Sequence, residues 1–262
     1  MTTIKLSCAV GVLGAAALVL TPVAASAGGD TYISISGGLS LLGDSDNDGA
    51  FDGDFTTGTG ATIPAGVVLP DGSPVGWTTE FDAGFAISGA VGKRFGPFRG
   101  ELEVAYQNNG VDTHLDVVAS DIALGAEDAG VLITGSDALG VGVADLVADG
   151  QGDLSTVYVM ANAYYDLQTG AFSPYVGAGV GIGFTDVEYV PSAVSIIDDN
   201  ATAFAYQIMV GASYAMTDAT DLFVGYRYRG TTDVSVEADL FAADFDIENR
   251  GSLFEAGVRF NF

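Results

Sequence analysis

Cysteine and histidine are nearly missing from this chain of 262 residues, which has one of each. Cys8 lies in a segment that we expect to be removed, so the mature chain has no disulfide, thiol nucleophile or cysteine metal ligand. A serine–histidine hydrolase needs a histidine base, and His114 is the single candidate. It stands near Asp112 and Asp116 with no serine close in sequence, which favours a solvated loop histidine over a catalytic one.

Basic residues are also few, with 8 lysines and arginines against 34 aspartates and glutamates and a formal net charge of −26 at pH 7. Such a charge repels nucleic acid and anionic surfaces, so nucleic acid is not an expected partner. High net charge is common in disordered chains. Here 48% of the residues are hydrophobic and 10% are aromatic, which favours an ordered chain.

Long apolar runs are confined to the start of the chain, because charges, glycines and prolines interrupt every later one. Residues 1–27 have the pattern of a signal peptide: Lys5, an apolar run at 9–20 and small residues at 25–27. An uncleaved anchor is the alternative, but the run is too short for a spanning helix. We therefore expect a mature domain of residues 28–262 that retains 7 basic residues.

In place of such runs the sequence has alternation with a period of two, which is typical of a strand with one apolar and one polar face. Within 253–262 the apolar face has Phe254, Ala256, Val258, Phe260 and Phe262, and the other has Glu255, Gly257, Arg259 and Asn261. Turn residues end each such stretch. The eight expected strands lie at about 32–41, 80–95, 99–108, 154–167, 172–189, 203–215, 221–229 and 245–262.

The connections between these strands alternate between long and short. Outer-membrane barrels have short periplasmic turns and longer extracellular loops. The sequence therefore predicts an all-β fold, an eight-stranded antiparallel up-and-down transmembrane β-barrel, with long acidic extracellular loops at about 43–79 and 109–153. The second of these contains apolar patches that indicate a short helix or strand extensions beyond the membrane. A soluble β-sandwich is the alternative.

Four segments carry a resemblance to a known family: 162–167, 173–181, 225–228 and 257–262. Together they resemble the small outer-membrane β-barrel family that includes opacity proteins and the transmembrane domain of OmpA. The resemblance implies location in the bacterial outer membrane, contact with its lipid and lipopolysaccharide, and insertion by the barrel-insertion machinery. In that family a terminal phenylalanine is part of the assembly signal, which Phe260 and Phe262 match.

Charged residues are expected inside the barrel. Five of the seven remaining bases take inward positions in this register, together with five acids. Buried charges must be paired, so we expect a closed interior, which is either a structural plug or a narrow ion path. The ten residues are Asp82, Arg94, Arg99, Glu101, Glu103, Asp166, Arg227, Arg229, Glu255 and Arg259.

Inward positions of the strand at 172–189 are occupied by Gly177, Gly179, Gly181 and Gly183. Glycine weakens a strand, so a row of four needs a reason. We expect these glycines to leave room for bulky side chains from across a narrow lumen.

Residues 44–49, in the first outer loop, match the opening of a calcium loop. Asp44, Asp46 and Asp48 supply hard oxygen ligands there, and Gly49 permits a sharp turn. The twelfth position is Phe55 instead of the usual glutamate, with Asp52 and Asp54 as substitutes. The alternative is a solvated acidic loop.

The sequence thus favours a monomeric, non-enzymatic outer-membrane protein that stiffens the envelope. Its acidic loops face the medium for adhesion or for contact with cations or a ligand. One alternative is a small porin or channel for ions or small apolar solutes. Another is a lipid-modifying barrel enzyme that uses His114 as its base. No cofactor is expected apart from calcium in the first outer loop.

Overall fold

The computed structural model describes residues 30–57, 66–120, 122–130, 138–167 and 169–262, so the expected signal peptide at 1–27 lies outside the described residues. Within these ranges no helix is long and apolar enough to cross a bilayer. Strands make up most of the described residues. The elements follow one another in the order β1 (Thr31–Leu42), β2 (Ser45–Phe51), β3 (Phe55–Thr56), β4 (Val68–Leu69), β5 (Pro74–Phe81), β6 (Gly84–Phe95), β7 (Phe98–Ala119), β8 (Ile122–Ala123), the helix α2 (Val143–Val147), β9 (Gly152–Asp166), β10 (Phe172–Tyr189), the 3-10 turn η1 (Pro191–Ala193), β11 (Ile197–Thr217), β12 (Thr220–Thr231), β13 (Val234–Glu237), β14 (Ala243–Ile247) and β15 (Arg250–Asn261).

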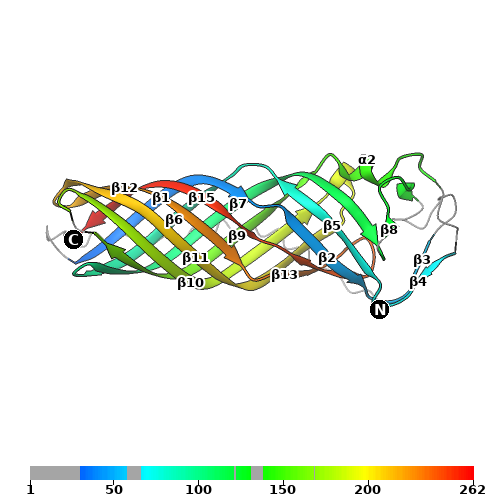
Figure 1. The fold of residues 1–262 in the computed structure, drawn as a ribbon, viewed down its shortest axis with the longest axis horizontal. Helices are drawn as coiled ribbons and strands as arrows, with labels where there is room; N and C mark the ends of the chain where they lie inside the picture. The colour runs from blue at the N-terminus through cyan, green and yellow to red at the C-terminus, as the bar shows by residue number, and fades with distance from the viewer. Residues whose placement is uncertain (1–29, 58–65, 121, 131–137, 168) are drawn as a thin grey trace, which may run out of the picture.

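Eight of these strands close into a ring of tilted antiparallel strands, in the order β7-β6-β1-β15-β12-β11-β10-β9, and β9 pairs back to β7 (Figure 1). The first and last strands lie side by side, with Ile35 opposite Val258. Closure pairs every edge, which a hydrocarbon environment requires because it offers no other hydrogen-bond partner. The prediction of an eight-stranded antiparallel barrel is confirmed, and β10 has the bounds that the alternation predicted.

The sheet continues beyond one end of the ring. Four shorter strands continue strands of the ring after short breaks: β2 follows β1, β5 precedes β6, β13 follows β12 and β14 precedes β15. These four pair with one another and with β7 in the order β13-β14-β2-β5-β7. Together with the ends of β7, β9, β10 and β11 at 109–119, 152–156, 185–189 and 197–203, they form a second layer that we call the outer tier. The hairpin β3–β4 and the helix α2 lie at its far end (Figure 1).

The prediction of a loop at 43–79 is therefore wrong for much of that region, which holds β2 and β5. The inward positions of β2 include the polar Ser45 and Asn47, so the alternation there is polar on both faces and no strand was expected. The region 109–153 contains both an extension of β7 and the helix α2.

Polarity reverses along the barrel. In the ring the outward side chains are apolar, with Leu102 65% and Val224 60% exposed, and the lumen is polar. In the outer tier the interior is mainly apolar, with Phe245 and Ile247 fully or almost fully buried. Outward positions there are often acidic, as at Asp46, Asp48, Asp186, Glu188, Asp244 and Asp246. The outward surface of the ring thus suits the hydrocarbon of a membrane, and the outward surface of the outer tier suits water.

Three of the four inward glycines of β10 make room as expected, but for a different neighbour. A Cβ atom at Gly177, Gly179 or Gly181 would run into the adjacent strand β9, where Tyr164, Asn162 and Met160 are the directly opposite residues. The prediction that the bulky groups come from across the lumen is wrong for these three positions, whereas a Cβ atom at Gly183 would first meet Thr231 of β12. Because cross-strand neighbours share a face, a glycine on one strand leaves space for a large residue beside it.

Candidate functional site

The centre of the lumen is organised around Glu103, which is 1% exposed. Arg227 donates from Nη1 to Glu103 Oε2 at 2.6 Å, and Arg229 donates from Nη2 to Glu103 Oε1 at 2.7 Å. Arg227 also donates from Nε to Glu255 Oε1 at 2.7 Å. Both oxygens of one buried carboxylate are thus held by charged donors, the strong form of the hydrogen bond.

Neutral amides extend this cluster. Asn162 donates from Nδ2 to Glu103 Oε2 at 2.9 Å, and Gln207 donates from Nε2 to Asn162 Oδ1 at 2.7 Å. Arg229 Nε donates to Gln207 Oε1 at 2.9 Å, and its guanidinium lies 4.7 Å from the ring centre of Tyr158. The network therefore joins residues of β7, β9, β11, β12 and β15.

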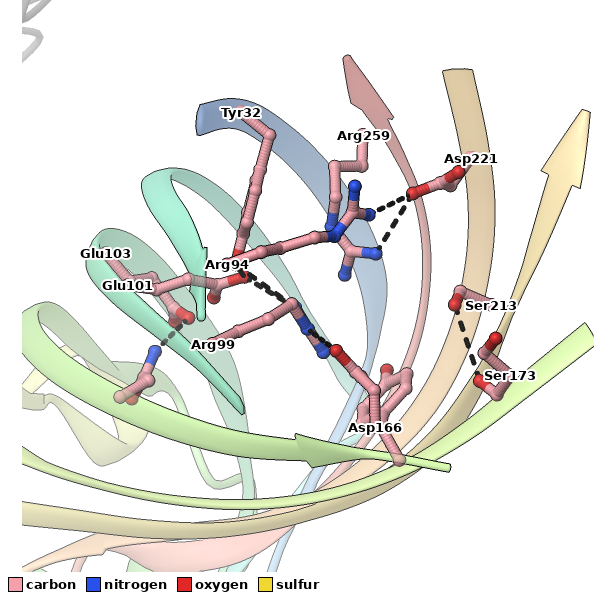
Figure 2. A network of polar contacts seen from close by, with 12 residues as sticks. Tyr32, Arg94, Arg99, Glu101, Glu103, Asp166, Ser173, Ser213, Asp221 and Arg259 are labelled. Carbon is pink, nitrogen blue, oxygen red and sulfur yellow. Dashed lines mark hydrogen bonds and ion pairs between the residues drawn. The ribbon is translucent and has the colours of Figure 1, made fainter. Parts of the chain in front are cut away.

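A second cluster fills the end of the lumen where the chain ends (Figure 2). Arg99 donates from Nε to Asp166 Oδ2 at 2.6 Å and from Nη1 to Glu101 Oε1 at 3.0 Å, and Tyr32 donates its hydroxyl to the same Glu101 oxygen at 2.6 Å. The planar guanidinium of Arg99 also stacks on Tyr164, 4.2 Å from its ring centre. The arginine here serves as both ion-pair partner and packing surface.

Nine of the ten charged residues expected in the lumen line it, and Arg94 is partly exposed at the lumen's end. The tenth, Asp82, is exposed in the break between β5 and β6, so its inward placement is wrong. The sequence prediction continues one strand through residues 82–83, which lie between β5 and β6 in the structure. Asp221 was missed, although it shares the inward face of β12 with Arg227; it lies 2.6 Å from Arg94 Nη2 and 3.4 Å from Arg259 Nη1.

Little free space remains among these side chains. A void lined by Glu101, Glu103, Arg227 and Arg259 has a volume of about 10 Å³. This is at the lower limit for one water molecule. The arrangement suits a plug better than an ion path.

His114 lies inside the outer tier and is 2% exposed, so the prediction of a solvated loop histidine is wrong. Strand alternation from Leu102 and Val104 would place His114 on the outward face. However, Thr113 pairs with Glu80 and Val111 pairs with Phe81, so β7 carries one extra residue there. This bulge turns His114 inward.

The protonation state of His114 follows from its partner Thr79. Thr79 Oγ1 accepts hydrogen bonds from Asn47 Nδ2 at 2.7 Å and Trp77 Nε1 at 3.1 Å, so its own hydrogen is left for His114 Nδ1 at 2.8 Å. Nδ1 is then the acceptor, and the hydrogen of the neutral ring is on Nε2. Burial lowers the pKa of His114 to about 4, partly opposed by Asp149.

The calcium motif does not form the wrapped loop that its sequence predicts. Residues Ser45–Phe51 are an extended strand, with Asp46 and Asp48 pointing outward and exposed. Asn47 points inward to Thr79, which fixes this strand in place. Asp54 accepts the backbone N–H of Asp71 at 3.1 Å. In the part of the chain that the structure describes, no three His, Cys, Asp or Glu side chains come together in a way that could hold a metal ion.

Carboxylates face one another on the outer wall instead. Glu188 on β10 lies directly opposite Asp153 on β9 and Asp198 on β11, and Asp186 lies one step along the same face. We call these four residues the acidic patch. Burial, with repulsion from Asp153 and Asp198, raises the pKa of both Asp186 and Glu188. Asp48 and Asp246 form a second directly opposed pair, on β2 and β14.

Comparison with known proteins gives matches of three kinds: a family model, individual relatives and solved structures. The model of a family described as surface antigen matches residues 75–262. The outer membrane protein PagN of Salmonella typhimurium is 29% identical over 115 residues, 39% of this chain and 48% of PagN. An uncharacterized protein of Brucella abortus is 38% identical over 79 residues, 26% of this chain and 28% of that protein. The chain thus spans less than half the length of the curated relatives it matches.

Among solved structures, the outer membrane protein OprG from Pseudomonas aeruginosa aligns over 89% of this chain and 96% of its own, with a TM-score of 0.54 and 15% sequence identity. An identity this low supports the fold alone.

Proposed function

Since the chain belongs to the surface-antigen family and is a bacterial outer-membrane β-barrel protein, we propose that it acts without catalysis, as an anchored support that holds an acidic wall at the cell surface. That wall contacts divalent cations or a positively charged surface. The row of carboxylates Asp153, Glu188 and Asp198 is the observation that carries the proposal.

Like charges directly opposite each other destabilise a sheet. Here opposed carboxylates occur in the acidic patch, at Asp48–Asp246 and at Glu237–Asp244. None of these carboxylates has a basic residue as its cross-strand neighbour. A cation or a cationic partner would relieve this repulsion on binding, so the cost in the free protein favours association. At the outer rim, divalent cations would also bridge these carboxylates to lipopolysaccharide phosphates.

The ring supports the role of an anchor. Its lumen is filled by paired charges, which counts against the alternative of a channel. His114 counts against the alternative of a lipid-modifying enzyme, since it is 2% exposed and its Nδ1 is bound to Thr79. We propose that the barrel works as a monomer, because the ring closes within one chain.

A pair of matched variants tests the proposal. Asp153→Asn/Glu188→Gln/Asp198→Asn neutralises the row, whereas Asp116→Asn/Asp145→Asn/Asp233→Asn removes the same charge from exposed positions elsewhere on the outer side. Cells that display each form are allowed to settle on amine-coated glass, with and without calcium chloride. We expect the first variant to lose attachment several-fold and the second to keep it. Equal attachment by both variants and the parent would refute the role of the row.

A further inference from the structure

The far end of the outer tier contains an apolar cavity of about 120 Å³, which we call the tip socket. Phe51, Trp77 and Ile196 line it from the barrel wall, and residues of the hairpin β3–β4, the end of β7 and the helix α2 line it at the far end of the molecule (Figure 1). The socket reaches the surface, because its lining residues Val67 and Ile122 are 37% and 54% exposed. Apolar surface that stays open to water on an outward face calls for an explanation.

The wall of the tip socket selects an apolar occupant. The rings of Phe51 and Phe55 stack with 5.1 Å between their centres, and Phe241 lies 5.6 and 6.5 Å from these two. The polar groups in the wall have partners within the protein: Thr57 Oγ1 accepts a backbone N–H at 3.0 Å, and His114 Nδ1 is bound to a threonine outside the wall. An occupant is therefore held by the burial of its apolar surface and needs no polar atom of its own.

The volume limits the occupant to one group. A dry apolar cavity of about 150 Å³ binds benzene in another protein. The tip socket, at about 120 Å³, accommodates one large apolar side chain, such as leucine, methionine or phenylalanine. A lipid acyl chain is too long. A pocket that receives one anchor side chain between well-packed walls is typical of the centre of a protein–protein interface.

The surroundings of the tip socket are acidic. Four exposed aspartates, which we call the rim, are each directly adjacent in sequence to a lining residue: Asp52, Asp54, Asp116 and Asp239. No lysine or arginine is adjacent to a lining residue. A partner with basic residues on both sides of its apolar anchor complements this rim. A second copy of this chain, or an anionic surface, would instead bring like charges together.

We propose that the tip socket is a docking site for a partner polypeptide, which inserts one large apolar side chain and places flanking lysine or arginine residues against the aspartates of the rim. The anchor supplies most of the affinity, and the charges set its orientation and speed association. The tip socket is a different site from the acidic patch, so this inference does not depend on the role proposed for the patch.

The test uses three synthetic pentapeptides. Lys-Lys-Leu-Lys-Lys has the anchor and the basic flanks, Lys-Lys-Ser-Lys-Lys lacks the anchor, and Glu-Glu-Leu-Glu-Glu reverses the charge of the flanks. Trp77 is the single tryptophan of the chain and lines the socket, so its fluorescence reports occupancy in the protein folded in an uncharged detergent. We expect a saturable change with the first peptide. The serine peptide should bind at least about tenfold more weakly, the factor that burial of one leucine supports, and the glutamate peptide should bind several-fold more weakly.

Two variants test the socket itself. Val147→Phe fills it from α2 and should remove the fluorescence change. Ile122→Lys leaves the interior unchanged and adds a positive charge at an exposed position of the wall, so it should weaken binding of the basic peptide several-fold. Circular dichroism and the shift on unboiled gels establish folding. If Val147→Phe fails to fold, Ile122→Lys still decides.

Two triple variants test the rim. Each removes three exposed carboxylates, the first from the rim and the second from the side of the outer tier that adjoins the ring: Asp52→Asn/Asp116→Asn/Asp239→Asn and Asp46→Asn/Asp186→Asn/Asp233→Asn. We expect the first variant to bind Lys-Lys-Leu-Lys-Lys several-fold more weakly than the parent. The second should keep the affinity of the parent, because screening by salt limits the reach of charges that lie farther from the socket.

Several results would overturn the proposal. These are the absence of a saturable change with Lys-Lys-Leu-Lys-Lys, an equal response to the serine or glutamate peptide, and an unchanged response in the folded socket variants. Binding of N-acetylleucine amide as tightly as the basic peptide would make the socket a site for small molecules instead. A dimer in sedimentation that the peptide disperses and Ile122→Lys abolishes would make the occupant a second copy of the chain.

Discussion

Glu103 Oε1 and Arg229 Nη2 lie 2.7 Å apart although three strands separate β7 from β12 in either direction around the ring. A side-chain bridge between opposite walls spans the lumen at that level. We therefore expect the purified barrel to show no stable conductance in a planar bilayer. The double variant Glu103→Ala/Arg229→Ala removes the bridge and should show occasional openings. A steady conductance from the parent protein would contradict the plug and restore the channel alternative.

Removal of a single charge from this cluster should be costly. Glu103→Gln preserves the shape but leaves Arg229 without a carboxylate in a buried site. Breaking a buried ion pair in this way costs about 3–5 kcal/mol. We expect the midpoint of urea unfolding in detergent to fall accordingly. The control Asp218→Asn changes an exposed carboxylate in the turn between β11 and β12 and should change stability by less than about 0.5 kcal/mol.

The ring was predictable because each of its strands spans the membrane with apolar residues on one face, as in β10 and β15. The charged residues of the lumen followed from the same alternation. The sequence does not show the register in which strands pair. The position of Glu188 directly opposite Asp153 and Asp198 is therefore visible only in the structure.

The outer tier was less predictable for two physical reasons. Its strands reverse the polarity of the ring and place polar residues such as Asn47 on the inward face, which hides the alternation. A single inserted residue near Asp112 then moves His114 from the outside to the inside. A bulge of this kind leaves no mark in the periodicity before it, so the sequence alone favoured a loop.

The inward glycines of β10 offer a test of packing inside the ring. A Cβ atom at Gly179 would overlap Asn162 Oδ1 and crowd Gln207, both members of the Glu103 network. Gly179→Ala should therefore destabilise the barrel by about 1–3 kcal/mol through overpacking. Gly100→Ala is the matched control, since nothing lies within 4 Å of a Cβ atom there. The temperature at which the folded gel band is lost should be lower for Gly179→Ala than for the parent and unchanged for Gly100→Ala. The same temperature for both variants would show that the glycine row has no packing role.

The stability of the outer tier should depend on pH through His114. Its pKa falls from 6.5 to about 4 in the folded protein because burial penalises the charged ring. A histidine with a lowered pKa stabilises the fold above its unfolded value, and this contribution is lost as the pH falls from 6.5 toward 4. The loss amounts to about 3 kcal/mol at the acid end of this range.

The acidic patch acts in the opposite direction. Raised pKa values at Asp186 and Glu188 mean that acid relieves their repulsion, so their contribution to stability improves as the pH falls through those values. The difference between the parent and His114→Gln isolates the histidine, because both forms keep the patch. Urea unfolding followed by Trp77 fluorescence should show the parent losing stability relative to His114→Gln between pH 6.5 and 4, with the two curves parallel above pH 7. Parallel curves throughout would mean that the His114 ring is solvated and titrates normally.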